Sequence, residues 1–160
     1  AYGTSGPVRP NLQMQTLTPV LKKGVLREAL RYLQDFDRMT MVILVQADAP
    51  TTDDDLALLR MTGIRPIVLR ETALDQAVAV ARDNHAGKLI VLGDDDGLRD
   101  AEGKLTSRLR LCELPADWQV PGLQEMLDGG TTLQVLNGTI HAALIEELFT
   151  DRGIGTMVLP

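Results

Sequence analysis

The residues best suited to chemistry in this chain are three consecutive aspartates, Asp94 to Asp96, followed by Gly97. They come directly after the apolar run at residues 88–92, which predicts a buried strand. Ligands bind in open α/β sheets where such strands end. Asp94 could therefore contact a nucleotide ribose, or bind Mg²⁺ together with Asp95 and Asp96, although a solvated acidic turn fits the same residues. Gly97 fits a turn that requires a positive φ, which serves folding and binding alike.

Histidine and cysteine are too scarce in this chain for most metal or nucleophilic sites. His141 lies at a predicted helix start without an evident Ser or Cys partner, and His85 is the other histidine, so we expect His141 to pack or to lie on the surface. Cys112 is the one cysteine, which excludes an internal disulfide framework and predicts a small core residue rather than a nucleophile. One basic cluster, either an anion patch or a solvated face, comprises Lys22, Lys23 and Arg27.

Alternating strand and helix patterns must position these residues. Apolar segments predict strands at residues 41–45, 66–69, 88–92, 133–136 and 155–159, and the continuous apolar run at 41–45 is typical of a strand covered on both faces. Amphipathic or capped segments predict helices at residues 24–36, 53–62, 72–84, 122–127 and 140–149, the last capped by Thr139. Residues 98–111 carry a hairpin signal with Glu102-Gly103 as the turn. Buried strands that alternate with helices predict a mostly parallel sheet with helices on both faces.

Length and composition limit the classes of protein. The chain has 160 residues, 44% of them apolar and 24% charged, which predicts one globular domain. A net charge of −6 and only 3% aromatic residues argue against a nucleic-acid surface. No apolar run approaches the roughly 20 residues of a membrane span. Residues 1–20 lack periodicity and predict a flexible arm, and the first residue, Ala1, fits removal of a methionine or of a targeting peptide.

The last thirty residues, TTLQVLNGTIHAALIEELFTDRGIGTMVLP, carry the most specific pattern. Its parts are a strand followed by Gly138, His141-Ala142, Glu147-Leu148-Phe149-Thr150 and Gly153-Ile154-Gly155-Thr156. This pattern resembles the carboxyl end of acetylglutamate kinase, in the amino-acid kinase family. Residues 88–109 resemble that family's nucleotide-side strand and hairpin, and residues 25–45 and 56–69 resemble its first helices and strands. The resemblance covers most of residues 23–160 and implies a compact three-layer α/β/α sandwich.

The chain departs from the family pattern where the family binds phosphate. The family's first strand ends in a lysine followed by a glycine pair, whereas this chain has Leu44-Val45-Gln46-Ala47. The family's second strand ends in a glycine-rich turn, whereas residues 70–73 here are Arg-Glu-Thr-Ala. A second family lysine falls near Gly122, and the long substrate-binding middle is missing. Phosphoryl transfer needs cations and bare amides at the phosphate oxygens, so the resemblance implies a shortened and degenerate kinase.

The resemblance also implies roles for four residues. Asp75 opens the segment Asp75-Gln76-Ala77, which resembles the family's helix start with its catalytic aspartate. The alternative for Asp75 is a helix carboxylate favoured by the dipole. The carboxyl end builds an arginine pocket in arginine-inhibited relatives, which implies effector binding by Glu147, Asp151 and Gly155. Alternatively, Glu147 lies on the surface and the glycines only shape the turn into the last strand.

We therefore expect an acetylglutamate-kinase-like protein that lacks the phosphate-binding Lys and Gly elements and serves as a non-catalytic binding or assembly subunit. One alternative is a small functional kinase of arginine biosynthesis, which phosphorylates an acyl-amino-acid carboxylate with ATP and Mg²⁺ and is completed by a partner. Another is an arginine or amino-acid sensor.

Further expectations concern partners, organisation and location. We expect a protein partner or a homo-oligomer, a small amino-acid ligand in the sensor case, no nucleic acid and no membrane span. No cofactor is expected unless the chain is catalytic. Residues 1–22 are predicted to form a flexible arm and residues 23–160 a single domain. The expected location is the cytoplasm, or an organelle matrix if the N-terminus is a processed one.

Overall fold

The computed structural model of the chain describes residues 23, 24, 26, 27, 30, 31, 34, 36–46, 53–139 and 155–160. The chain divides into two compact units, Ala1–Asp35 and Phe36–Pro160. Every described residue of the first unit is helical, which confirms the predicted helix at those positions, and its Leu26 and Leu30 are exposed. The predicted division into an arm of residues 1–22 and a domain of residues 23–160 stays a prediction.

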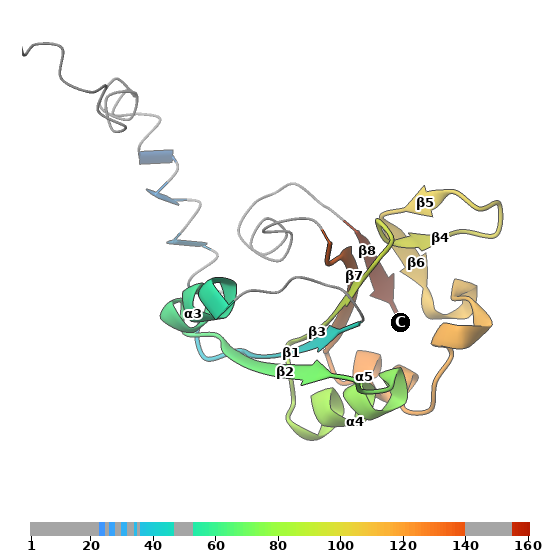
Figure 1. Cartoon of the computed structure of the whole chain (residues 1–160), viewed down its shortest axis with the longest axis horizontal. Coiled ribbons are helices and arrows are strands. Elements are labelled where there is room, and N and C mark those ends of the chain that lie inside the picture. Colours follow the sequence, from blue (N-terminus) through green and yellow to red (C-terminus); the bar gives the residue numbers. More distant parts are fainter. Residues whose placement is uncertain are drawn as a thin grey trace, which may run out of the picture. The chain divides into compact units, whose positions relative to one another are not determined.

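The second unit is built on a six-stranded sheet with the strand order β2-β1-β3-β7-β8-β6 (Figure 1). Its strands are β1 (Thr40–Val45), β2 (Arg65–Arg70), β3 (Lys88–Gly93), β6 (Arg108–Arg110), β7 (Thr132–Asn137) and β8 (Thr156–Leu159). Strands β2, β1, β3 and β7 run parallel, whereas β8 is antiparallel to β7 and parallel to β6. The predicted α/β class with a mostly parallel sheet is confirmed. The carboxyl ends of the four parallel strands therefore meet at one edge of the sheet.

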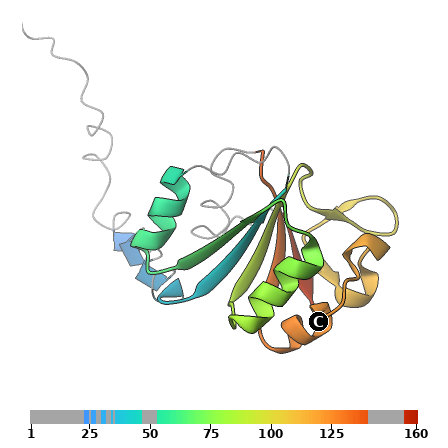
Figure 2. The ribbon, with the colours of Figure 1, turned by 60° about the horizontal axis from the view of Figure 1, so that its bottom comes forward.

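Helices lie against both faces of this sheet (Figure 2). They are α3 (Asp53–Met61), α4 (Leu74–Asp83) and α5 (Leu123–Asp128). Strands β2 and β3 flank β1 on opposite sides, so right-handed crossovers place α3 and α4 on opposite faces. Val42 and Leu44 of β1 belong to the apolar cluster that includes Ala77 of α4, whereas Met41 and Ile43 are buried on the other face. Both faces of β1 are thus covered, as its continuous apolar sequence predicts.

The predicted helices lie within two residues of their expected bounds where the structure describes them. Helix α3 begins with its three aspartates and ends before Gly63, whose φ is +89° and whose N–H donates to the Arg60 carbonyl at 3.1 Å. Helix α4 begins where the Ala73 N–H donates to the Gln76 side chain at 3.3 Å. Helix α5 lies where a short helix is expected. The helix predicted for residues 140–149 lies outside the described residues.

Two expectations about strands need correction. Residues 66–69 are predicted to be buried, but β2 is only half-buried. The reason is that β2 is an outermost strand of the sheet formed by the described residues, with a neighbouring strand on one side only. The predicted hairpin extends only over β4 (Leu98–Arg99) and β5 (Leu105–Thr106), with Gly103 at φ +79° in its turn. Strand β6 leaves the hairpin and pairs with β8 instead.

Candidate functional site

The acidic turn after β3 is held together largely by its own carboxylates. Oδ1 of Asp95 accepts the Asp96 backbone N–H at 2.8 Å, and both oxygens of Asp95 accept from the Arg99 guanidinium at 3.3 Å. The Asp96 N–H, and after it Arg99, holds the pKa of the Asp95 carboxyl below its ordinary value. Oδ1 of Asp96 accepts from the amide of Asn137, at the end of β7, at 2.9 Å. Two of the three carboxylates therefore organise the turn, and Asp94 is exposed.

The structure gives no support to a cation site at these aspartates. Among the described residues, no group of three or more His, Cys, Asp or Glu side chains is arranged to hold a metal ion. Asp95 is occupied by Arg99, and Asp96 by Asn137. The described side chains of the turn at Asp94 to Asp96 therefore fit Mg²⁺ poorly.

Gly97 occupies a place where the hairpin and the last strand come very close. Its φ is +150°, and a Cβ on it would lie 2.6 Å from Oγ1 of Thr156 and 3.3 Å from Cα of Gly155. Gly155 has a φ of +80°, and a Cβ on it would overlap the Val135 carbonyl of the neighbouring strand β7. The positive φ predicted at Gly97 is confirmed, and close backbone packing is enough to explain both glycines.

The hydroxyl of Thr156 links three elements, a role that its place in the C-terminal motif does not predict. Its Oγ1 accepts the Leu98 N–H at 2.8 Å and donates to the Thr106 carbonyl at 2.6 Å. Thr156 is only 2% exposed and begins β8, so one buried hydroxyl fixes both hairpin strands to the main sheet. The Gly-Ile-Gly-Thr motif offers a signal for this residue, although the bonding partners lie 50 and 58 positions away.

Asp75 lies at the same edge of the sheet, in the first turn of α4, and is exposed. It follows the turn after β2, where Glu71 has a φ of +51° and the Thr72 hydroxyl donates to the Arg70 carbonyl at 2.9 Å. A positive φ is uncommon for a residue with a side chain. The backbone of this turn thus takes a form that suits glycine, at the place where the resembling family has a glycine-rich turn, while the sequence supplies a glutamate.

The end of β1 offers neither a lysine nor a described glycine. Gln46 is exposed, its backbone N–H donates to the Leu92 carbonyl at 3.1 Å, and its Oε1 lies 3.2 Å from the position of a Cβ on Gly93. Two cations are described close to this edge of the sheet. They are Arg70, the exposed last residue of β2, and Arg99, which is engaged by Asp95. Among the described residues, this edge therefore presents more carboxylates than free cations.

The remaining predicted site residues fall into two groups. Those outside the described residues are Lys22, His141, Glu147 and Asp151. Lys23, Arg27 and His85 are exposed and described, and His85 follows α4 with a φ of +50°. The prediction that Cys112 is a core residue is wrong: its side chain is exposed. It lies in a single helical turn, η2 (Leu111–Glu113), that directs Leu111 and the following Leu114 inward instead.

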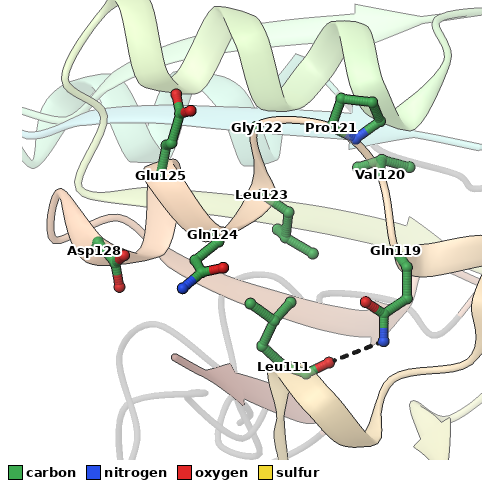
Figure 3. Close-up of a pocket in the computed structure, with 9 residues that line it drawn as sticks. All are labelled: Leu111, Gln119, Val120, Pro121, Gly122, Leu123, Gln124, Glu125 and Asp128. Atoms are coloured by element: carbon green, nitrogen blue, oxygen red, sulfur yellow. Dashed lines mark hydrogen bonds between the residues drawn. The ribbon is translucent and has the colours of Figure 1, made fainter.

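A cavity of about 540 Å³ lies away from this edge, between η2 and the start of α5 (Figure 3). Its lining residues are Leu111, Gln119, Val120, Pro121, Gly122, Leu123, Gln124, Glu125 and Asp128. Gly122 has a φ of +84° and precedes α5, and a Cβ on it would lie 3.2 Å from Nη1 of Arg82 on α4. Neither Asp75 nor Asp94 lines this cavity.

The fold resembles that of α/β proteins of the amino-acid kinase type. The solved structure of N-acetylglutamate synthase from Neisseria gonorrhoeae, with coenzyme A and N-acetyl-glutamate, superposes with a TM-score of 0.70 at 17% identity. The match covers 86% of this chain and 63% of that one. The same enzyme solved with coenzyme A and L-arginine gives a TM-score of 0.69 at 15% identity, over 86% of this chain and 65% of that one.

Sequence comparison confirms a resemblance to acetylglutamate kinases and shows a resemblance to amino-acid acetyltransferases as well. An amino-acid acetyltransferase of Pseudomonas aeruginosa is 39% identical over 95 residues, which cover 52% of this chain and 22% of the relative. An acetylglutamate kinase of Streptomyces avermitilis is 36% identical over 97 residues, 52% of this chain and 32% of the relative. The chain thus matches between a fifth and a third of these relatives' lengths. No family model matches it.

Proposed function

We propose that this chain is a non-catalytic module of the acetylglutamate kinase type, which binds a ligand or a partner rather than transferring phosphate. The observation that carries the proposal is the charge at the carboxyl edge of the sheet. Gln46, Glu71 and the Asp94 turn lie where the resembling family has a lysine, a glycine turn and its nucleotide hairpin. ATP carries several negative charges, which an edge rich in carboxylates repels.

Phosphoryl transfer at this edge would lack electrostatic stabilisation of the transferred phosphate. Phosphoryl transfer depends almost entirely on positioning and on countercharge at the phosphate oxygens. Loss of one preorganised contact of this kind typically costs about 3 kcal/mol, or roughly a hundredfold in rate. Of the cations described near the edge, Arg99 is already paired with Asp95, which leaves Arg70. With two lysine positions changed, we expect turnover to fall below detection.

The relatives support a role separate from kinase chemistry. The chain is similar both to a protein named as a kinase and to one named as an acetyltransferase, over about half of its own length in each case. A structural module shared by two reaction classes does not by itself specify either reaction. The likeness to an N-acetylglutamate synthase solved with L-arginine agrees with ligand binding as the retained role.

The test is a coupled ADP-release assay with N-acetylglutamate, ATP and Mg²⁺, alongside calorimetry with ATP and Mg²⁺. We expect no turnover and no binding heat. Asp75→Ala and Asp83→Ala form a matched pair, because both aspartates are exposed on α4, at its first and last turns. Turnover that disappears in Asp75→Ala but persists in Asp83→Ala would overturn the proposal and revive the small-kinase alternative.

A further inference from the structure

The cavity beside α5 combines apolar walls with a rim of hydrogen-bond acceptors. Leu111 and Leu123 point toward one another across it, with Val120 nearby (Figure 3). Leu123 is buried, whereas Leu111 and Val120 are half-buried and pack against the core from its surface. Binding sites for small molecules typically combine such walls with a few polar groups, in volumes of about 300–1,000 Å³. The volume of this cavity lies within that range.

The amide of Gln119 presents an acceptor to this cavity. Its Nε2 donates to the Leu111 and Leu114 carbonyls, both at 3.1 Å, which uses both N–H groups of the amide. The Oε1 atom is therefore the polar atom of Gln119 that remains to bind a ligand, and a carbonyl oxygen only accepts. A ligand beside Gln119 must bring its own donor.

The opposite rim, on α5, is anionic. Asp128 is exposed and has no described partner, whereas Oε2 of Glu125 pairs with Arg82 at 3.3 Å. The described lining includes neither lysine nor arginine. Gly122, near which the resembling family has a lysine, lines the cavity without a side chain. An anion would find no countercharge among these residues, whereas a cation would find Asp128.

We propose that this cavity binds a small ligand with a branched apolar body and a cationic amine or guanidinium head. The apolar body lies between Leu111 and Leu123, and the cationic head donates to Asp128 on the α5 rim. The proposal deepens the ligand-binding part of the proposed function and shares Gly122 with the argument for it. Its test measures binding of an amine and not phosphate transfer, so the two can fail separately.

Three probes with the same branched five-carbon skeleton test the charge requirement: isopentylamine, isovalerate and isopentanol. Each is titrated into the ¹⁵N- and methyl-labelled chain while the NMR signals of Leu111, Val120 and Leu123 are followed. We expect saturable shifts with the amine, with a Kd of about 10 mM as befits a fragment of six heavy atoms. Isovalerate should give none, and isopentanol should bind at least about threefold more weakly than the amine.

A matched pair of variants tests the assigned carboxylate. Asp128→Asn should weaken amine binding about three- to fivefold, because it removes one exposed charge contact while keeping the shape. Asp117→Asn, at an exposed aspartate outside the lining, should leave the Kd unchanged. Equal binding of the three probes, absence of saturable shifts up to about ten times the expected Kd, or equal effects of the two variants would overturn the proposal. Thermal melting of both variants verifies that each remains folded.

Discussion

Replacing Thr156 by valine should loosen the hairpin from the main sheet. Valine keeps the branched shape of threonine but removes the hydroxyl that bonds to Leu98 and Thr106. Leu98 is only 7% exposed, so its N–H would lose its partner away from water, which typically costs about 1–3 kcal/mol. Thr106 is half-buried, and its carbonyl can recover part of its loss by bonding to water. Together these changes predict a loss of about 2–3 kcal/mol in the free energy of unfolding.

Urea unfolding followed by the fluorescence of Trp118, the one tryptophan, measures this loss. Trp118 packs against the core, so its emission should change on unfolding. Thr156→Ser is the matched control, because it keeps both hydrogen bonds and loses one methyl group, for about 0.8 kcal/mol. Hydrogen exchange of the Leu98 amide should accelerate in the valine variant and remain slow in the serine variant. If valine costs no more than serine and the Leu98 amide stays protected, the role assigned to Thr156 is wrong.

Three further outcomes follow from features described above. Gly155→Ala should destabilise the chain by about 1–3 kcal/mol more than Gly103→Ala. Both glycines have φ near +80°, but only a Cβ on Gly155 would overlap neighbouring atoms. Equal melting temperatures of the two variants would contradict this. The Asp95 carboxyl should titrate by NMR below 3.8. Its stabilising contribution is therefore complete above about pH 5 and is lost as the pH falls through its folded pKa. Arg99→Gln should raise this pKa only part of the way, since the Asp96 N–H is the larger cause, and a midpoint at 3.8 or above in the unmodified chain would contradict the assignment. Cys112 should react with a thiol reagent in the native chain, and labelling that requires denaturant would show that it is buried after all.

Local patterns in the sequence predict most of the elements. Strands β1 and β3 carry continuous apolar runs, and the end of α3 at Gly63 follows from the need for a left-handed residue there. The half-burial of β2 could not be predicted, because it depends on the order of strands in the sheet rather than on the residues of β2. The same holds for β6, whose partner β8 lies some fifty residues further along the chain.

The sequence predicts where the candidate site lies better than it predicts the contacts within the site. The position of Asp94 to Asp96 after a buried strand places them at the carboxyl edge of the sheet, as observed. The bond from Asn137 to Asp96 joins residues 41 positions apart, and no local pattern contains it. Cys112 shows the opposite failure, because residue type favours burial while the geometry of one short helical turn exposes it.

Strand β2 bears on how the chain behaves at high concentration. Since the Arg65 N–H donates to the Met39 carbonyl beside β1 at 2.8 Å, the alternate residues Pro66, Val68 and Arg70 turn their backbone groups the other way. Proline has no N–H to offer there, and β2 carries an exposed arginine at each end. Strand β2 is therefore poorly suited to pair with β2 of a second molecule, which disfavours aggregation by strand pairing through β2.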